Sequence, residues 1–368
     1  MTGILVYILL FLFVVWLAVR LFLRAPDHSQ FDLPHVAFTG SDGKASVENE
    51  QVLDLLQEMQ ATIGSLPRRL QMLEMRRIMD EGFTGSPADG DSLGVNIEAV
   101  DIDGMAAEWV VSPRADANRR LLYLHGGGFF VGSPRSHRMM TAELSRRCGV
   151  AVLAIEYRLM PENSRMGSVY DSQRAFQWMI DNGPAGQGEA REIYVSGDSA
   201  GGNLALMLSA WVRDKGLADI NGVVAFSPST DSTLAGGSIR ANIPTDPMLG
   251  PALGAFARLP VTLKALAAFF GSRVNPRNPL VSPLFGNLSD LPPTLVQASE
   301  AEMLLDDARR YVNKARRQGS PATLQTWPGM VHVWPMFHSI LPEGKEALDQ
   351  VAKFVAKVSA GRPTAVVN

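Results

Sequence analysis

The feature that most restricts the fold of this chain is the alternation, after Gly94, of short apolar runs with amphipathic stretches. Strand-length runs that take turns with helically spaced stretches indicate an α/β fold, with a mostly parallel sheet and helices on both faces. We predict strands in LLYLHG, VAVLAIEY, IYVSGD, GVVAFSP, PTLVQAS and ATLQTWP, and helices near Ser136–Arg147, Ser168–Asp181, Ala200–Lys215, Leu304–Gln318 and Lys345–Val358.

Two segments depart from this rhythm. VNIEAVDIDGMAAEWVVSP alternates apolar and polar residues around a central Asp-Gly, which predicts two strands joined by a turn at an antiparallel edge of the sheet. The interval between Ser227 and Ser289 is rich in Pro and Gly, with one apolar helical piece, PVTLKALAAFFG. It is too long for a plain connection, so we expect an insertion that covers one edge of the sheet.

The beginning of the chain is almost entirely apolar. No charged side chain precedes Arg20, and the run approaches the ~20 residues that cross a bilayer. A signal peptide would carry positive charge before the run, and a buried helix of a soluble protein usually keeps a polar face, which Ile4 to Val19 hardly has. We therefore predict a membrane anchor, and Arg20 and Arg24 place the rest of the chain in the cytoplasm by the positive-inside tendency.

Composition excludes some classes of function. The net charge is −3 and no basic stripe is present, which argues against binding to nucleic acid. Cys148 is the only cysteine, so the chain can form neither an internal disulfide nor a cysteine zinc site.

A serine between glycines, in Gly197–Gly201, follows the predicted strand IYVS and opens the helix predicted from Ala200. A serine on a strand-to-helix turn needs small neighbours because the backbone there is strained and closely approached. The unpaired amides at the helix start carry partial positive charge, which suits a developing oxyanion. We predict that Ser199 is a nucleophile rather than part of a tight packing corner.

A serine hydroxyl needs a base to attack at neutral pH. Of the six histidines, His332 lies on the loop after the last predicted strand, where the catalytic groups of an α/β sheet gather. We predict His332 as this base, with a buried structural histidine as the alternative. The others are His28 and His35 in a linker, His125 before a glycine loop, His137 at a helix start, and His338 after Pro335 at an expected helix start.

A third group should hold the imidazole. Four carboxylates follow the predicted strand PTLVQAS, namely Glu300, Glu302, Asp306 and Asp307. We predict Glu302 as the acid and keep Glu300, on the same loop, as the runner-up. The two aspartates fall inside a predicted helix, where we expect them to cap it or to pair with Arg309 or Arg310. The order serine, acid, histidine is that of an α/β-hydrolase.

The run HGGGFFVG after LLYL places three glycines where backbone N–H groups can approach a ligand closely. A phosphate loop is the rival interpretation. No Gly-Lys-Ser/Thr follows, however, and the spacing is not Gly-x-Gly-x-x-Gly. Together with the serine turn downstream, the loop predicts stabilisation of an oxyanion.

These segments together resemble the hormone-sensitive-lipase-like carboxylesterases (family IV) of the α/β-hydrolase superfamily. The resemblance rests on HGGGFFVGSPRSH, EYRLMPEN, VSGDSAGGNLA, SPLFGNLSDLPPTLVQASEAEMLLDD and WPGMVHVW, in this order over about residues 95–355. It implies an esterase for small, often short-acyl esters without metal or cofactor, with Ser199 as nucleophile and His332 as base. It also implies oxyanion amides from Gly127, Gly128 and Ala200, supporting roles for His125 and Asp198, and a cap of N-terminal helices and the 230–280 insertion.

The chain departs from the family pattern at two places. The acid motif of the family commonly reads Asp-Pro-Leu-x-Asp-Glu, whereas EMLLDD here puts Glu302, one methylene longer, in that place. Met160 stands where alanine is usual and would reshape the pocket. We expect the substrate pocket to be lined by Phe129, Phe130 and Met160, with Phe269 and Phe270 as further candidates. Each of these four phenylalanines could equally be core. The ending GMVHVW also resembles lactone hydrolases.

We therefore predict a serine carboxylesterase that hydrolyses small, short- to medium-acyl esters through a Ser-His-Glu triad and an acyl-enzyme. A lactone hydrolase or amidase would use the same triad, and a membrane-tethered binding protein with an idle site is the alternative of another class. The expected partners are a small-molecule ester and the membrane, and a homodimer stays open. The predicted parts are an anchor (1–24), a linker and cap helices (25–94, helical between Glu50 and Glu81 and divided at Gly64 and Pro67), a hydrolase domain (95–358) and a tail (359–368).

Overall fold

A computed structural model describes residues 2–33, 38–39, 44–81 and 90–360 of the 368-residue chain. Residues 34–37 and 40–43 of the predicted linker, which include His35, lie outside the described residues, as do residues 361–368 of the predicted tail.

A nine-stranded, mostly parallel sheet forms the centre of the molecule, in the order β1-β11-β10-β9-β8-β4-β5-β3-β2. β3 runs antiparallel to both β2 and β5, so the predicted antiparallel pair does form one edge, and the predicted α/β fold is confirmed. The strands are β1 (Phe38–Thr39), β2 (Asn96–Ile102), β3 (Met105–Val111), β4 (Asp116–Leu124), β5 (Val150–Ile155), β8 (Glu192–Asp198), β9 (Gly222–Phe226), β10 (Thr294–Ser299) and β11 (Ala322–Trp327), and β6 (Asn182–Gly183) with β7 (Gly186–Gln187) forms a separate small hairpin.

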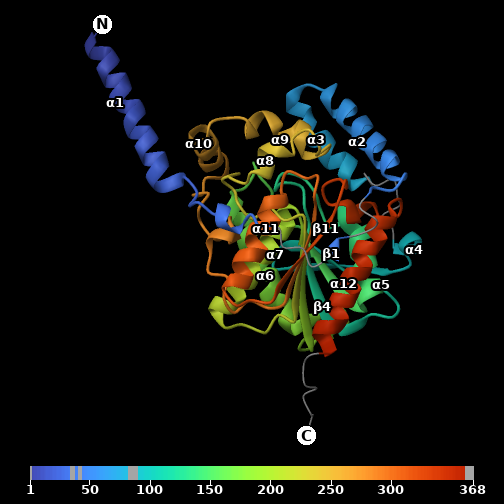
Figure 1. The fold of residues 1–368 in the computed structure, drawn as a ribbon. Coiled ribbons are helices and arrows are strands. Elements are labelled where there is room, and N and C mark those ends of the chain that lie inside the picture. The colour runs from blue at the N-terminus through green and yellow to red at the C-terminus, as the bar shows by residue number, and fades with distance from the viewer. Residues whose placement is uncertain (1, 34–37, 40–43, 82–89, 361–368) are drawn as a thin grey trace.

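Helices cover both faces of the sheet, as the buried runs of β5, β9 and β10 require. One apolar core lies under α5 (Arg138–Cys148) and α12 (Pro342–Ala360). The other lies under α6 (Arg165–Asp181), α7 (Ala200–Lys215) and α11 (Leu305–Arg317). In Figure 1 these two sets stand on opposite sides of the strands.

A group of helices, here called the cap, gathers at one end of the sheet (Figure 1). It touches the segments that directly follow strands, since Arg76 reaches Phe130 O after β4 and Asn242 reaches Glu302 O after β10. The 230–280 insertion therefore lies over the carboxyl ends of the strands. From the sequence we expected it along one edge of the sheet, and that expectation was wrong. The cap helices are α2 (Asn49–Gly64), α3 (Arg68–Asp80), α8 (Ser238–Ala241), α9 (Leu249–Ala257) and α10 (Val261–Ser272).

The division of the N-terminal helical stretch at Gly64 and Pro67 is confirmed, because α2 ends at the first and α3 begins after the second. Of the insertion, only α10 was predicted. α8 has only four residues, and Gly and Pro interrupt the nine-residue α9 (LGPALGAFA), so neither shows a helical pattern in the sequence.

The segment predicted as a linker packs on the domain. Its short helix η2 (Ser29–Phe31) lies against α11, where Asn313 donates a hydrogen bond to Phe31 O at 2.8 Å. β1 pairs in parallel with β11 and so adds an edge strand to the sheet. The short α4 (Gly90–Leu93) leads into β2. Neither η2 nor β1 has a sequence pattern that predicts it.

The N-terminal apolar helix projects away from the rest of the molecule in Figure 1. α1 (Thr2–Ala18) continues into a wider turn, η1 (Val19–Leu23). The 20 residues Ile4–Leu23 are long and apolar enough to cross a membrane, with a mean hydropathy of 2.7. A signal sequence would satisfy the same criterion, so length and composition identify a membrane-compatible helix and no more.

Candidate active site

Ser199 occupies a strained turn between β8 and α7. Its backbone has φ +52° and ψ −114°, a region that side-chain-bearing residues rarely adopt. The turn is fixed to the neighbouring strand because the Ser199 N–H donates to Phe226 O at 2.8 Å. Only glycine fits beside it, since a Cβ on Gly201 would lie 1.8 Å from Leu124 O. The serine side chain is therefore presented at the carboxyl end of the sheet.

His332 reaches this serine from the loop between β11 and the short helix η5 (Trp334–Phe337). Its Nε2 lies 2.9 Å from Ser199 Oγ, and the ring is buried. The loop is held by its neighbours on both sides. The Val333 N–H donates to Ser227 Oγ at 3.1 Å, and Met330 O accepts a hydrogen bond from Ser299 Oγ at 2.6 Å.

Glu302 holds the other side of the imidazole. Its Oε2 lies 2.5 Å from His332 Nδ1, and its Oε1 accepts a hydrogen bond from the Ser299 N–H at 2.9 Å. The carboxylate is fully buried. The structure thus brings Ser199, His332 and Glu302, which come from three distant segments, into one hydrogen-bonded row.

The other carboxylates near Glu302 face elsewhere. Glu300 is exposed and accepts a hydrogen bond from the Thr326 hydroxyl at 2.9 Å. Asp306 lies 3.5 Å from Arg309, one of the two pairings expected for it, and also accepts from the Ser238 N–H. Asp307 instead accepts from two backbone N–H groups of residues 230 and 231, and burial raises its pKa.

The environment of His332 favours its charged form. Burial lowers the pKa of the imidazole, but the hydrogen bond and negative charge of Glu302 outweigh it, so that the pKa is raised from 6.5. Asp246 adds to this effect from the insertion. Asp246 also accepts a hydrogen bond at 2.8 Å from the N–H of Met303, the residue after Glu302. It lies in a segment without periodic pattern, so no sequence signal identified it.

The glycine loop after β4 lies beside this row. Gly127 has φ +105° and Gly128 has φ +64°, and a Cβ on Gly127 would lie 2.1 Å from Val131 O. Within the described residues, the N–H groups of these two glycines take part in no hydrogen bond. They are free to donate to a ligand, as is expected of an oxyanion site. Ala200, the third predicted donor, is the first residue of α7.

A buried network joins the loop to the serine turn. Asp198 Oδ1 accepts hydrogen bonds from the Tyr123 hydroxyl at 2.7 Å and from the Gly126 N–H at 2.9 Å. His137 Nε2 lies 3.4 Å from the same oxygen. The His125 ring stacks on Tyr157 with centroids 4.0 Å apart, and burial, with His137 nearby, lowers its pKa to about 3. His125 is therefore neutral at physiological pH, where it packs and does not exchange protons.

His137 ends a short helix, η3 (Arg135–His137), ahead of α5, close to the helix start expected for it. His338 differs from expectation, because it ends the short η5 helix instead of opening one. It is buried and contacts Pro335 O through Nδ1. His28 is half-buried at the beginning of η2, with its ring 5.2 Å from that of Phe285.

The three residues expected to line the substrate pocket lie together next to the glycine loop. Phe129 is half-buried and Phe130 exposed, while Met160 is buried and its N–H donates to Phe129 O at 2.8 Å. Arg165 lies over the Phe129 ring, with Cζ 3.5 Å from the centroid. Of the two further candidates, Phe270 is 71% exposed on the outside of α10, so it does not line a pocket.

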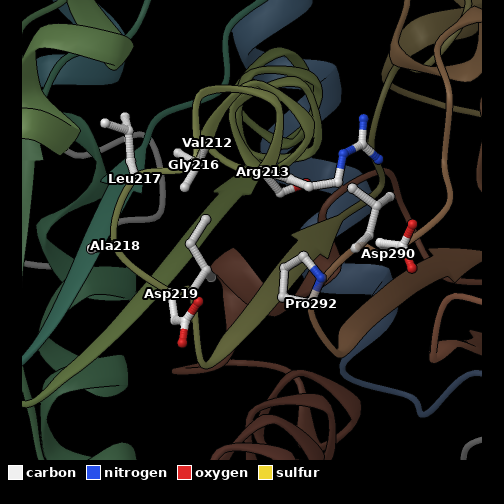
Figure 2. A pocket seen from close by; sticks show the side chains of 11 residues that line it. Val212, Arg213, Gly216, Leu217, Ala218, Asp219, Asp290 and Pro292 are labelled. Carbon is white, nitrogen blue, oxygen red and sulfur yellow. The ribbon is translucent and has the colours of Figure 1, made fainter.

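Other parts of the described chain offer little for this chemistry. A pocket of about 420 Å³ lies between the end of α7 and the loops that precede β9 and β10, as Figure 2 shows. These loops enter the amino ends of the strands, so this pocket lies at the end of the sheet opposite to Ser199. Within the described ranges, His, Cys, Asp and Glu side chains form no group of three or more that could hold a metal ion.

Comparison with known proteins yields one consistent class. Residues 121–336 match a family model described as alpha/beta hydrolase fold. An acetyl-hydrolase of Streptomyces hygroscopicus is 36% identical over 70% of this chain and 82% of its own length. An esterase of Acinetobacter venetianus is 31% identical over 72% of this chain and 83% of its own length.

Solved structures agree with these relatives. The crystal structure of an esterase from the bacterial hormone-sensitive lipase family has a TM-score of 0.73 and 34% identity, and covers 85% of this chain and 99% of that one. The crystal structure of an esterase/lipase from an uncultured bacterium has a TM-score of 0.72 and 34% identity, over 86% of this chain and 100% of that one.

Proposed function

The chain belongs to the α/β-hydrolase fold family and is a carboxylic ester hydrolase of the hormone-sensitive lipase group, and we propose that it works through Ser199, His332 and Glu302. The observation that supports this assignment is the unbroken row of hydrogen bonds from Ser199 Oγ through the imidazole to the Glu302 carboxylate.

The reaction is acyl transfer in two steps. Ser199 Oγ attacks the ester carbonyl carbon while His332 Nε2 takes the hydroxyl proton, and Glu302 stabilises the imidazolium that forms. His332 then gives this proton to the leaving alcohol as the tetrahedral intermediate collapses to an acyl-enzyme. A water molecule repeats the cycle, in which His332 takes a proton from the water and returns it to Ser199 as the acid leaves.

The charge that develops on the carbonyl oxygen is stabilised by main-chain donors. We assign this role to the N–H groups of Gly127, Gly128 and Ala200, because the first two have no hydrogen-bond partner within the described residues and the third begins α7. Losing one donor of this kind typically costs about 3–4 kcal/mol of transition-state stabilisation.

The substrate proposed is a small ester with a short to medium acyl chain, held beside Phe129, Phe130 and Met160. The name of the acetyl-hydrolase relative supports a short acyl group. The same two-step mechanism also applies to a lactone or an anilide. A panel of acyl esters, lactones and anilides, compared by kcat/KM, tests this choice, and a preference for lactones or anilides would contradict it.

The experiment for the mechanism is the Ser199→Ala variant together with labelling by an activated phosphonate. We expect turnover to fall by about four or more orders of magnitude with unchanged folding. The phosphonate should modify Ser199 in the wild-type chain only. Wild-type chain that neither reacts with the phosphonate nor hydrolyses any ester would favour the idle binding protein instead, and near-normal turnover of the variant would retire the mechanism.

We further propose that Ile4–Leu23 anchors the protein in a membrane, with the hydrolase domain in the cytoplasm. The helix has the length and hydropathy for a span, it is almost wholly exposed, and Arg20 and Arg24 lie at its end towards the domain. Carbonate extraction of membranes that carry the full chain tests the anchor, since release into the supernatant, or a shortened N-terminus on the mature protein, would contradict it.

A further inference from the structure

The helix α10 has its polar and apolar sides reversed. Its outer positions are apolar, with Leu263 49% and Phe270 71% exposed and Ala267 between them at the same face. Lys264, its only charged residue, points inward and is 3% exposed. A helix on the surface of a soluble protein normally has the opposite arrangement. The outer face of α10, here called the α10 stripe, therefore suits an apolar environment.

The α10 stripe lies where the apolar helix meets the domain. η1 packs against α10, and Arg277 Nη1 donates to Leu21 O while Asn275 Nδ2 donates to Phe22 O, both at 3.0 Å. In Figure 1 α10 stands beside the lower end of the α1 ribbon. If Ile4–Leu23 spans a bilayer, these contacts hold α10 at the depth at which the span leaves the hydrocarbon.

The same junction carries positive charge. A pocket of about 590 Å³ lies between residues 23–28, the segment 233–240 and α10. Its lining includes the cationic side chains of Arg24, Arg240, Lys264 and Arg310 and one carboxylate, Asp27. Arg310 is paired with Asp32, whereas the Lys264 ammonium donates to an uncharged partner, Leu234 O, at 2.7 Å. A cationic pocket next to an apolar surface matches the headgroup region of an anionic membrane.

The bend between α9 and α10 favours a helix that lies on the surface of a bilayer over a pair that crosses it. α9 and α10 together are apolar enough for a span, but they meet at an angle of 116°. A pair bent so strongly cannot cross as one rod, whereas one of its helices can lie in the interface with its apolar side towards the acyl chains.

We propose that the α10 stripe lies in the headgroup region of the same bilayer that holds α1, with lipid phosphates at the cationic junction pocket. This inference rests on the proposed membrane anchor and is independent of the catalytic assignment. Docking of the α10 stripe orients the cap, and the Ser199 site beneath the cap, towards the membrane surface. Esters dissolved in the bilayer then reach the enzyme without first entering bulk water.

The test places a fluorescent label on the stripe of the full chain in vesicles of phosphatidylcholine and phosphatidylglycerol. Phe270→Cys carries an environment-sensitive nitrobenzoxadiazole group, and Lys357→Cys, exposed on α12, carries it as a control. The native Cys148 is buried, which raises the pKa of its thiol to about 12, so only the introduced cysteine reacts.

We expect the label at position 270 to emit at shorter wavelength and to be quenched by nitroxide lipids, while the label at position 357 is quenched by iodide in the water. Equal accessibility of both labels to iodide overturns the docking while leaving the anchor and the catalytic site intact. Shielding from both iodide and nitroxide lipid would show that a second copy of the chain covers the stripe, and this also overturns the proposal. A chain that does not float with the vesicles removes the anchor and the docking together.

A pair of double variants supplies an independent readout. Leu263→Asp with Phe270→Asp places two charges on the stripe, and Lys353→Asp with Lys357→Asp places them on α12 as the matched control. We expect the first pair to lose hydrolysis of a vesicle-borne long-chain ester while keeping wild-type hydrolysis of a water-soluble ester, which also shows that it folds. An equal loss in both pairs, or none in the first, overturns the proposal.

Discussion

Asp198 accepts a hydrogen bond from the Gly126 N–H at 2.9 Å, and this contact connects the serine turn to the glycine loop. Asp198, the residue before Ser199, thereby sets the position of the loop whose N–H groups we assign to the oxyanion. Its charge is stabilised by the same surroundings, because His137 and the Tyr123 hydroxyl outweigh burial and lower the pKa of the Asp198 carboxyl. The two halves of the proposed oxyanion site are therefore fixed relative to each other by one carboxylate.

The first prediction concerns this contact. Asp198→Asn keeps the shape of the side chain but weakens its hold on the loop, so we expect kcat to fall by about 10- to 100-fold, less than the loss of a whole donor, with KM nearly unchanged. Tyr123→Phe removes the hydroxyl that donates to this oxygen but keeps the contact with the Gly126 N–H, so it should cost less. Steady-state kinetics of the two variants decides the matter, and a larger effect of Tyr123→Phe would contradict a positioning role for Asp198.

The second prediction concerns the acid. In Glu302→Gln the amide oxygen remains opposite the Ser299 N–H, so the amide NH2 faces His332 Nδ1 and leaves the ring proton on Nε2, towards Ser199. Because the base is then in the wrong tautomer, we expect kcat to fall by about three to four orders of magnitude. Glu300→Gln changes an exposed carboxylate bound to Thr326 and should keep wild-type kcat within about twofold. Similar losses in both variants would refute the assignment.

The third prediction concerns pH. As the proposed base, His332 must be neutral to take a proton. Because its pKa is raised above 6.5, we expect kcat/KM to rise with pH through a midpoint above 6.5. Removing the negative charge with Glu302→Gln leaves burial as the main influence, so the midpoint of the residual activity should move to lower pH. A pH profile of kcat/KM for both proteins tests the sign. A midpoint that does not move, or moves upward, would show that Glu302 does not set the pKa of the base.

Much of the fold was predictable because local patterns and tertiary environment agree. The predicted α7 matches the observed helix at both ends, since a Gly-rich turn begins it and Gly216, in the left-handed conformation, ends it. The strands β5 and β9 carry no polar side chain, so burial on both faces was visible in the sequence. β1 was missed because its two residues owe their strand conformation to β11 and to no pattern of their own.

The site was less predictable than the fold because it depends on distances between remote residues. Glu300 and Glu302 have the same chemistry and nearly the same sequence position, and only the fold turns one inward and the other to solvent. Asp246 influences His332 from an insertion in which Pro and Gly obscure every periodic signal.

The fourth prediction concerns the cap. None of the residues of α3 is fully buried, so we expect polar contacts to contribute much of what holds this helix in place. The Arg76 guanidinium donates to Phe130 O at 2.8 Å and to Met160 O at 3.1 Å, and it pairs with Glu162 at 2.9 Å. We expect Arg76→Met to raise KM for bulky esters severalfold and to speed amide hydrogen exchange over residues 68–80, with exchange in the sheet unchanged.

Arg77→Met is the matched control on the same helix. Within the described residues, Arg77 forms ion pairs with Glu74 and Glu81 of its own segment, in solvent, where such pairs contribute little. It should leave both KM and the exchange pattern near wild type. Equal behaviour of the two variants would mean that Arg76 does not hold α3 in place over the proposed substrate pocket at Phe130 and Met160.

The last prediction concerns Arg165, a buried cation that forms no ion pair with any carboxylate in the described part of the chain. It lies on the Phe129 ring, donates to Ser168 Oγ at 2.8 Å and to Asn203 Oδ1 at 2.6 Å, and burial lowers its pKa to about 9. Because the guanidinium is planar, it can stack on the Phe129 ring and donate these hydrogen bonds at the same time, and both interactions stabilise its charge.

Replacing this group should reveal which property matters. Arg165→Lys keeps a buried charge but cannot stack or reach both acceptors, so we expect a loss of about 3–5 kcal/mol in the free energy of unfolding. Arg165→Met gives up the hydrogen bonds together with the charge, and because no charge then needs stabilising in the interior, we expect a smaller loss, of about 1–3 kcal/mol. Urea unfolding of both variants measures the order. If lysine were tolerated better than methionine, the charge itself would be needed at this place, and an anionic group on the substrate would become its natural partner.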